Sequence, residues 1–89
     1  MKLPVFLRQH NLQLVLSNNL EMSDLDKRYV AVIGDTYFIH PKTGNKIQFV
    51  SNGRTPLKCL KKLVRFYGGK TAYRITDGTE ISFPVDLVL

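Results

Sequence analysis

Hydrophobic residues recur in short runs along most of the chain, and one longer stretch, residues 55–67, repeats at the ~3.6-residue period of an α-helix. Pro56 suits the first helical position, and Thr55 before it is a favoured N-cap residue. Gly68-Gly69 supplies the stop. The apolar positions of this stretch lie on one side of the predicted helix: Leu57, Leu60, Leu63, Val64 and Tyr67.

The other runs are rich in β-branched and aromatic residues and predict strands separated by turn residues. They cover residues 10–17, 28–33, 36–40, 46–50, 71–75 and 79–83. Asp77-Gly78 is a hairpin signal, Ser23-Asp24 is a cap signal for one helical turn in residues 20–27, and Val85–Leu89 is expected to pair at a sheet edge. The prediction is therefore an α+β fold, a small antiparallel sheet of short strands with one main amphipathic helix packed on it.

Length and composition narrow the class of protein. The 89 residues, 44% of them hydrophobic, correspond to a single folded domain over residues 1–89. No apolar run approaches the ~20 residues of a membrane span, and the N-terminal run is too short for a secretory signal. Cys59 stands alone, which excludes an internal disulfide and fits a reducing cytoplasm.

The net charge of +6 is unevenly distributed. Residues 27–74 hold eleven Lys and Arg against the single Asp35, whereas both ends of the chain are slightly acidic. Four of the cations fall within about 100° of arc on the polar side of the predicted helix. They are Lys58, Lys61, Lys62 and Arg65. A dense block of one sign favours a polyanionic partner, the alternative being a solvated surface with no partner.

Residues that could perform chemistry are sparse. His10 and His40 have no cysteine or acid at metal-ligand spacing, and Cys59 reads as a small buried thiol rather than a reactive one. Gly68-Gly69-Lys70-Thr71 matches the end of a phosphate-binding P-loop, but it follows a helix, and Val64 stands where the first glycine is required. The sequence therefore predicts no enzyme, no metal site and no cofactor.

Residues 37–70 resemble the C-terminal DNA-binding domain of H-NS-type (histone-like nucleoid-structuring) bacterial proteins. The shared features are Tyr37, a turn at residues 42–45, the aromatic Phe49, and Asn52-Gly53-Arg54-Thr55-Pro56 before a Leu/Lys helix. The family carries tryptophan in place of Phe49 and glycine in place of Ser51. Its long N-terminal oligomerisation region is missing here, so filament formation and gene silencing are not implied.

The resemblance implies a cytoplasmic, bacterial or phage protein whose loop enters the minor groove of AT-rich DNA. Arg54 would be the inserted cation, with Asn52 and Gly53 at the groove and Thr55 at a phosphate. Glycine allows close approach to the groove, whose negative potential in AT-tracts attracts arginine. The expected backbone contacts are Lys42, Lys46, Lys58, Lys61, Lys62 and Arg65. The competing interpretation of the loop is a tight strand-to-helix turn that happens to contain arginine.

Two other functions remain open. One is a protein-binding module, an adaptor or inhibitor that docks on an acidic partner or forms a homodimer through an edge strand, for which the apolar segment 85–89 is a candidate. The other is RNA binding through aromatic residues on strands, namely Tyr29, Tyr37, Phe38, Phe49 and Tyr73.

Overall fold

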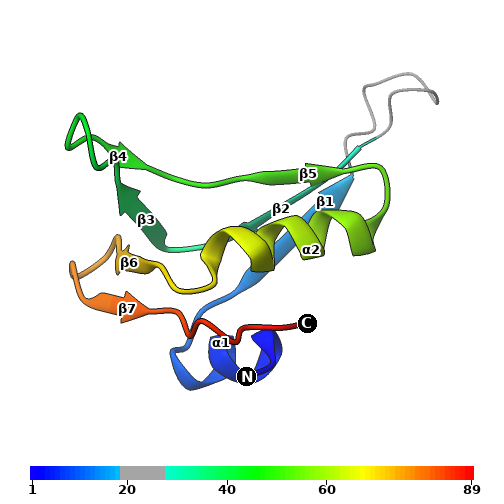
Figure 1. Ribbon diagram of the computed structural model, residues 1–89, viewed down its shortest axis with the longest axis horizontal. Coiled ribbons are helices and arrows are strands. Elements are labelled where there is room, and N and C mark those ends of the chain that lie inside the picture. Colours follow the sequence, from blue (N-terminus) through cyan, green and yellow to red (C-terminus); the bar gives the residue numbers. More distant parts are fainter. Residues whose placement is uncertain (19–27) are drawn as a thin grey trace.

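The computed structural model describes residues 1–18 and 28–89 (Figure 1). The helical turn expected in residues 20–27 lies outside the described residues. The helices are α1 (Leu3–Gln9) and α2 (Pro56–Tyr67). The strands are β1 (Leu14–Asn18), β2 (Tyr29–Ile33), β3 (Thr36–Ile39), β4 (Lys46–Ile47), β5 (Ser51–Gly53), β6 (Thr71–Arg74) and β7 (Glu80–Ser82).

The strands form two antiparallel sheets, ordered β1-β2-β5 and β4-β3-β6-β7. The α+β prediction is confirmed, with two sheets and a second helix in place of one of each. Residues 29–39 run antiparallel to residues 46–53, and each partner contributes a strand to both sheets. In Figure 1 this pair extends along the long axis, with β4 at one end and β5 at the other.

The two halves of this pair differ in register. Six residues separate Ala31 from Phe38, whereas only three separate their partners Ser51 and Ile47. The three extra residues are accommodated around the Gly34-Asp35 turn, where Asp35 has a φ of 61°. Asp and Asn tolerate this left-handed conformation better than other side chains. The predicted strand break at Gly34-Asp35 is therefore the point where the chain passes from one sheet to the other.

Helix α1 was not predicted, since no element was assigned before residue 10 and a strand was expected from there. Its buried side chains are Leu3, Phe6 and Leu7, a spacing that a loosely alternating strand pattern does not explain. The chain leaves the helix through Asn11, whose φ is 54°, so that β1 begins at Leu14 rather than at His10. The expected strand 10–17 is thus correct only in its second half.

The predicted strand 46–50 is also wrong in its extent. Pairing with β3 stops at Ile47, and the next three residues connect β4 to β5. Strand β5 occupies residues 51–53, which were interpreted as part of a loop. Its pairs are Tyr29 with Gly53 and Ala31 with Ser51.

Helix α2 begins and ends as predicted. Thr55 Oγ1 accepts the N–H of Lys58 at 3.1 Å, Pro56 lies in the first turn, and Gly69, just beyond the helix, has a φ of 77°. The helix packs on β2 and β5, and Tyr67 lies at the centre of the core among Phe38, Phe49, Phe66 and Phe83. Burial raises the pKa of the Tyr67 hydroxyl, and the hydroxyl of Thr36, 3.3 Å away, acts in the opposite direction.

The β6–β7 hairpin is confirmed, although its turn is wider than an Asp-Gly pair. Gly78 has a φ of 74°, and Asp77 acts through its side chain, which accepts the N–H of Thr79 at 2.9 Å. Residues 85–89, in contrast, do not join either sheet. Only Val88 pairs, in an isolated parallel bridge with Lys2 beside α1. Neither helix is long and apolar enough to cross a membrane, a finding that covers the described residues.

Candidate nucleic-acid interface

Arg54 and Thr55 form a two-residue corner between β5 and α2, and the backbone is fixed on both sides of it. Before it, Gly53 pairs with Tyr29 of β2; after it, Thr55 caps α2. Exposure alternates along the extended segment, so that Asn52 and Arg54 face solvent while Ser51 and Gly53 are buried. Arg54 makes no hydrogen bond or ion pair to residues 1–18 or 28–89. The guanidinium is therefore presented to solvent from a rigid support.

Gly53 has a different role from the one expected. It is buried, and a Cβ built on it would lie 2.7 Å from the backbone N of Cys59 in α2. Ser51 on the same side is also buried, and its hydroxyl is 3.1 Å from the carbonyl O of Cys59. These small residues allow α2 to pack closely on β5, which accounts for the glycine without any contact to a groove. Gly53 is therefore a support for Arg54 and not part of the exposed surface.

The solvent-facing side of α2 carries the four cations that the helical spacing placed together. Lys58, Lys61, Lys62 and Arg65 are all exposed. None forms a salt bridge to another described residue, and α2 holds no acidic side chain. We name these four residues the α2 strip; Arg54 lies just before the N-terminal end of the same helix.

The apolar face of α2 is rotated relative to the prediction. Leu57 is 56% exposed, whereas Cys59 is fully buried together with Leu63 and Tyr67. The expectation that Leu57 belongs to the core is wrong, because β5 contacts α2 on the side of Cys59. The expectation of a buried thiol at Cys59 is confirmed.

The other expected cations do not join the α2 strip. Lys42 and Lys46 lie in the β3–β4 hairpin, at the opposite end of the long axis from Arg54 (Figure 1). Lys46 Nζ lies 4.9 Å from the centre of the Tyr37 ring, in a cation–π contact. The molecule extends 39 Å in its longest direction, so one short ligand segment does not reach both ends.

Two further cations of the basic block are engaged by the protein itself. Lys70 Nζ donates to the carbonyl O of Phe66 at 2.8 Å and lies over the Phe66 ring. Arg74, only 19% exposed, donates to the carbonyl O of His10 at 2.6 Å and forms ion pairs with Asp35 and Asp77. The block is thus less available to a ligand than its formal charge indicates.

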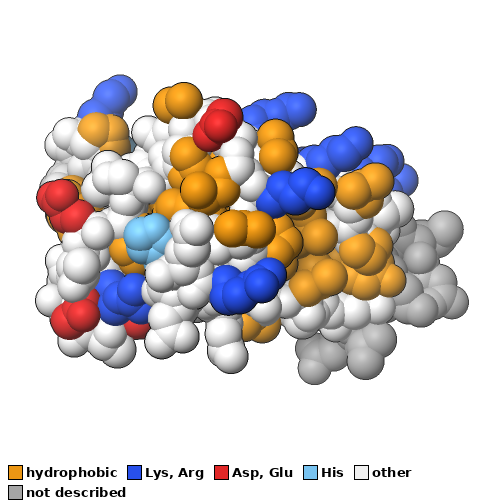
Figure 2. All heavy atoms as spheres, turned by 90° about the horizontal axis from the view of Figure 1, so that it is seen from below, with side chains coloured by type: hydrophobic (Ala, Val, Ile, Leu, Met, Phe, Trp, Pro, Cys, Tyr) orange, Lys and Arg blue, Asp and Glu red, His pale blue; other side chains and the backbone are white. Residues whose placement is uncertain are grey.

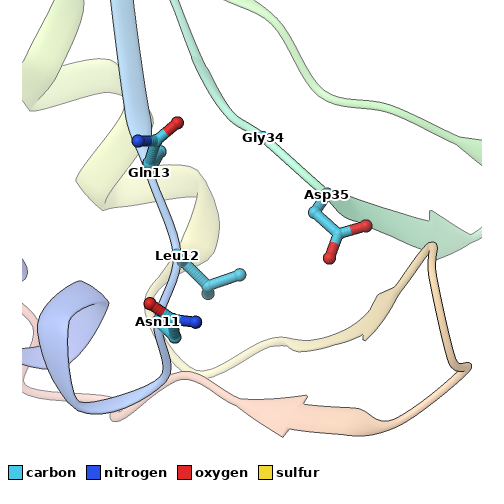
Figure 3. Close-up of a pocket in the computed structure, with 5 residues that line it drawn as sticks. All are labelled: Asn11, Leu12, Gln13, Gly34 and Asp35. Carbon is cyan, nitrogen blue, oxygen red and sulfur yellow. The ribbon is translucent and has the colours of Figure 1, made fainter.

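The hollow beside Asp35 is polar and is already used by the fold. It is lined by Asn11, Leu12, Gln13, Gly34 and Asp35, with the Asp35 carboxylate directed away from Gln13 (Figure 3). Both carboxylate oxygens of Asp35 accept from Thr76, one from its N–H and one from its hydroxyl. These two hydrogen bonds therefore connect the β6–β7 turn, which contains Thr76, to the turn between the two sheets, which contains Asp35.

The side chains of His40 and Asp77 stabilise turns of the protein itself. His40 Nδ1 accepts the N–H groups of Lys42 and Thr43 at 3.1 and 3.3 Å, so this histidine shapes its own turn. The hydrogen bond from Thr79 lowers the pKa of Asp77. Within residues 1–18 and 28–89, no three His, Cys, Asp or Glu side chains lie close enough together to hold a metal ion.

Four of the five aromatic residues considered for RNA binding pack against other aromatic rings of the protein. Tyr37 stacks on Tyr73 at 5.5 Å between ring centres, and Phe49 stacks on Phe66 at 3.6 Å. Phe38 is buried in the core. These rings are therefore already stacked within the protein, which does not favour base stacking.

Comparison of the chain with protein-family models, with curated proteins and with solved structures gives no match. The likeness to the H-NS-type domain therefore depends on the residues of segment 37–70. In that segment the order hairpin, arginine corner, basic helix is present, but Asn52 and Gly53 lie in a paired strand rather than in an open loop.

Proposed function

We propose that this protein binds duplex DNA, with Arg54 in the minor groove of AT-rich sequence and the α2 strip on the phosphates. The supporting observation is the Arg54 corner. The backbone at Arg54 is held between a paired strand and a capped helix and needs little ordering when it binds, so less backbone conformational entropy is lost. A cytoplasmic, nucleoid-associated role in transcription regulation is part of the same proposal.

The local geometry suits a groove contact of limited depth. Asn52 lies on the same exposed side of the chain as Arg54 and can hydrogen-bond to base edges. Thr55 Oγ1 accepts from the helix, which leaves its hydroxyl proton for a phosphate oxygen. A narrow AT-tract groove concentrates negative potential, and one extended guanidinium is enough to sense it.

The α2 strip supplies affinity that does not depend on sequence. Lys58 and Arg65 are seven residues apart, which is about 10 Å along a helix. The four helix cations face the phosphates while Arg54 occupies the groove, and four neutralised phosphates predict a slope of about −3.6 for log K against log salt. Lys42 and Lys46 would add contacts only on a longer or bent duplex.

The test compares AT-rich and GC-rich duplexes of equal length by fluorescence anisotropy. Arg54→Ala is expected to abolish the preference for the AT-rich duplex, a loss of about 1–3 kcal/mol of discrimination. Arg8→Ala, which removes the same charge from exposed α1, is the matched control and is expected to keep the preference. A wild-type protein without the preference, or an Arg54→Ala variant that retains it, contradicts the proposal.

A further inference from the structure

A second surface lies between α2 and the C-terminal segment. After a turn in which the N–H of Leu87 donates to Pro84 O at 3.3 Å, residues 87–89 run beside α2 in the opposite direction, and the two border an open, shallow groove of about 380 Å³ (Figure 1). One wall is formed by Lys61, Val64 and Arg65 of α2, and the other by Leu87, Val88 and Leu89. Seen from below, hydrophobic side chains gather over the middle and right of the molecule, with Lys and Arg side chains among them (Figure 2).

The C-terminal wall of the groove, residues 87–89, has backbone groups along one edge that are unpaired within the described part of the chain. Val88 uses both of its backbone groups on the N-terminal side: its N–H donates to Met1 O at 2.9 Å, and its C=O accepts from Leu3 at 2.6 Å. The C=O of Leu87 and the N–H of Leu89 have no backbone partner among the described residues. In extended chain, neighbouring residues direct these groups to opposite edges, which leaves this pair for another strand.

The described side chains that line the groove carry positive charge and no negative charge. Lys61 and Arg65 are exposed at the rim, and no acidic residue lines the groove. Asp86, the nearest acid in sequence, is paired with the N-terminal amine of Met1 at 3.2 Å. An occupant with carboxylates opposite the helix therefore gains electrostatic complementarity.

We propose that this groove binds an extended segment of a partner protein in which apolar and acidic side chains alternate. The backbone of that segment would pair with Leu87 and Leu89, its apolar side chains would enter between Val64 and Val88, and its carboxylates would meet Lys61 and Arg65. Strand addition of this kind uses main-chain hydrogen bonds for affinity and side-chain pockets for specificity.

The backbone groups of Leu87 and Leu89 beside the groove, unpaired among the described residues, favour a peptide over an anionic membrane surface. A membrane contact uses protruding apolar side chains and has no need of unpaired backbone groups. Val85 illustrates the difference, since it is 90% exposed but lies outside the groove lining. The inference does not depend on the proposed DNA binding, although Lys61 and Arg65 belong to both surfaces.

The experiment selects binders to the full chain from a library of random peptides displayed on phage. Enriched sequences are expected to alternate Val, Leu or Ile with Asp or Glu. Synthetic copies of these peptides are then titrated against Lys61→Glu/Arg65→Glu and, as the matched control, Lys58→Glu/Lys62→Glu. Both double variants change the charge of exposed α2 positions equally, but only the first pair lines the groove.

Peptide affinity is expected to fall at least about tenfold in the groove pair and to change little in the control pair. Duplex DNA affinity is expected to fall in both, so failure of one proposal is distinguishable from failure of the other. A second pair of variants tests the apolar contact: Val88→Asp is expected to abolish peptide binding, whereas Val85→Asp leaves it unchanged. No enrichment, or selected peptides that bind the groove variants as well as the controls, overturns the inference.

Vesicles of phosphatidylglycerol and phosphatidylcholine supply the competing outcome. The inference expects no binding of the protein to them at physiological salt. Vesicle binding that is lost in Val85→Asp as well as in Val88→Asp identifies the surface as a membrane contact and overturns the peptide proposal.

Discussion

Arg54 and Arg74 both belong to the basic block and both lie next to turns, yet their surroundings are opposite. Arg74 is 19% exposed and joins three parts of the chain through His10, Asp35 and Asp77. Arg54 is exposed and has no polar partner among residues 1–18 and 28–89. Equal formal charge therefore serves the fold at one site and is available to a ligand at the other. A count of cations in the sequence does not separate the two roles.

The largest effect is expected at the support of the Arg54 corner. Gly53→Ala places a methyl group 2.7 Å from the backbone of α2, which cannot yield as a flexible side chain would. We expect a loss of about 3 kcal/mol in unfolding free energy, measured by urea denaturation. Gly44→Ala is the control. A Cβ added at Gly44 meets no atom within 4 Å, so the only cost is the backbone strain of a φ of 72°, about 1 kcal/mol. Equal losses in both variants contradict the close packing.

Arg74→Ala tests the structural side of the comparison. It leaves the carbonyl of His10 and the half-buried Asp35 without their cation, and we expect a loss of about 2 kcal/mol. Arg54→Ala is expected to stay within about 0.5 kcal/mol of wild type. In duplex binding the order of the two effects is reversed: Arg54→Ala is expected to lose the AT preference, and Arg74→Ala is expected to keep it. If Arg54→Ala is the more destabilising variant, Arg54 is a structural residue.

Thr55→Ala is expected to cost about 1 kcal/mol, because it removes the acceptor for the N–H of Lys58 at the first turn of α2. Thr55→Ser retains a hydroxyl and should recover most of the loss. Thermal unfolding followed by circular dichroism measures both. No difference between the two variants would mean that the cap does not hold the corner.

The smallest effect concerns pH at the Arg74 end. The pKa of Asp77 is lowered from its ordinary value of 3.8, mainly by the hydrogen bonds from Thr79 and also by Arg74. A carboxyl group whose pKa is lower in the folded state stabilises the fold at pH values above its unfolded-state pKa, where it is ionised. This stabilisation is lost as the pH falls through the folded-state pKa. As pH falls below 3.8, wild type should lose more stability than Asp77→Asn, as urea midpoints will measure. A parallel decline of the two proteins argues against a role for this carboxylate.

The sequence predicted the elements whose signals are local. Helix α2 is defined by Thr55, Pro56 and Gly69, and its caps depend only on neighbouring backbone groups. The turns at Gly34-Asp35 and Gly78 were found for the same reason. Helix α1 was missed because seven residues give a weak periodic signal, and its burial depends on the distant partners Val88 and Phe83.

The candidate site was predictable to a similar extent. Helical spacing alone brought Lys58, Lys61, Lys62 and Arg65 to one exposed side. The engagement of Arg74 was not visible, because His10 and Asp35 lie far away in sequence. The packing role of Gly53 was missed as well, since it depends on how closely β5 approaches Cys59. The groove beside α2 had only one indication, the apolar residues near the end of the chain.

The three extra residues at the Gly34-Asp35 turn make the long antiparallel pair two separately aligned halves. Lengthening or shortening this turn would change the angle between the β3–β4 hairpin and the Arg54 corner while leaving the hydrogen-bond ladder of each half intact. The length of this turn therefore fixes the spacing between Lys42 and Lys46 at one end and Arg54 at the other. Under the proposed DNA binding, that spacing would decide which curvature of duplex both ends contact together.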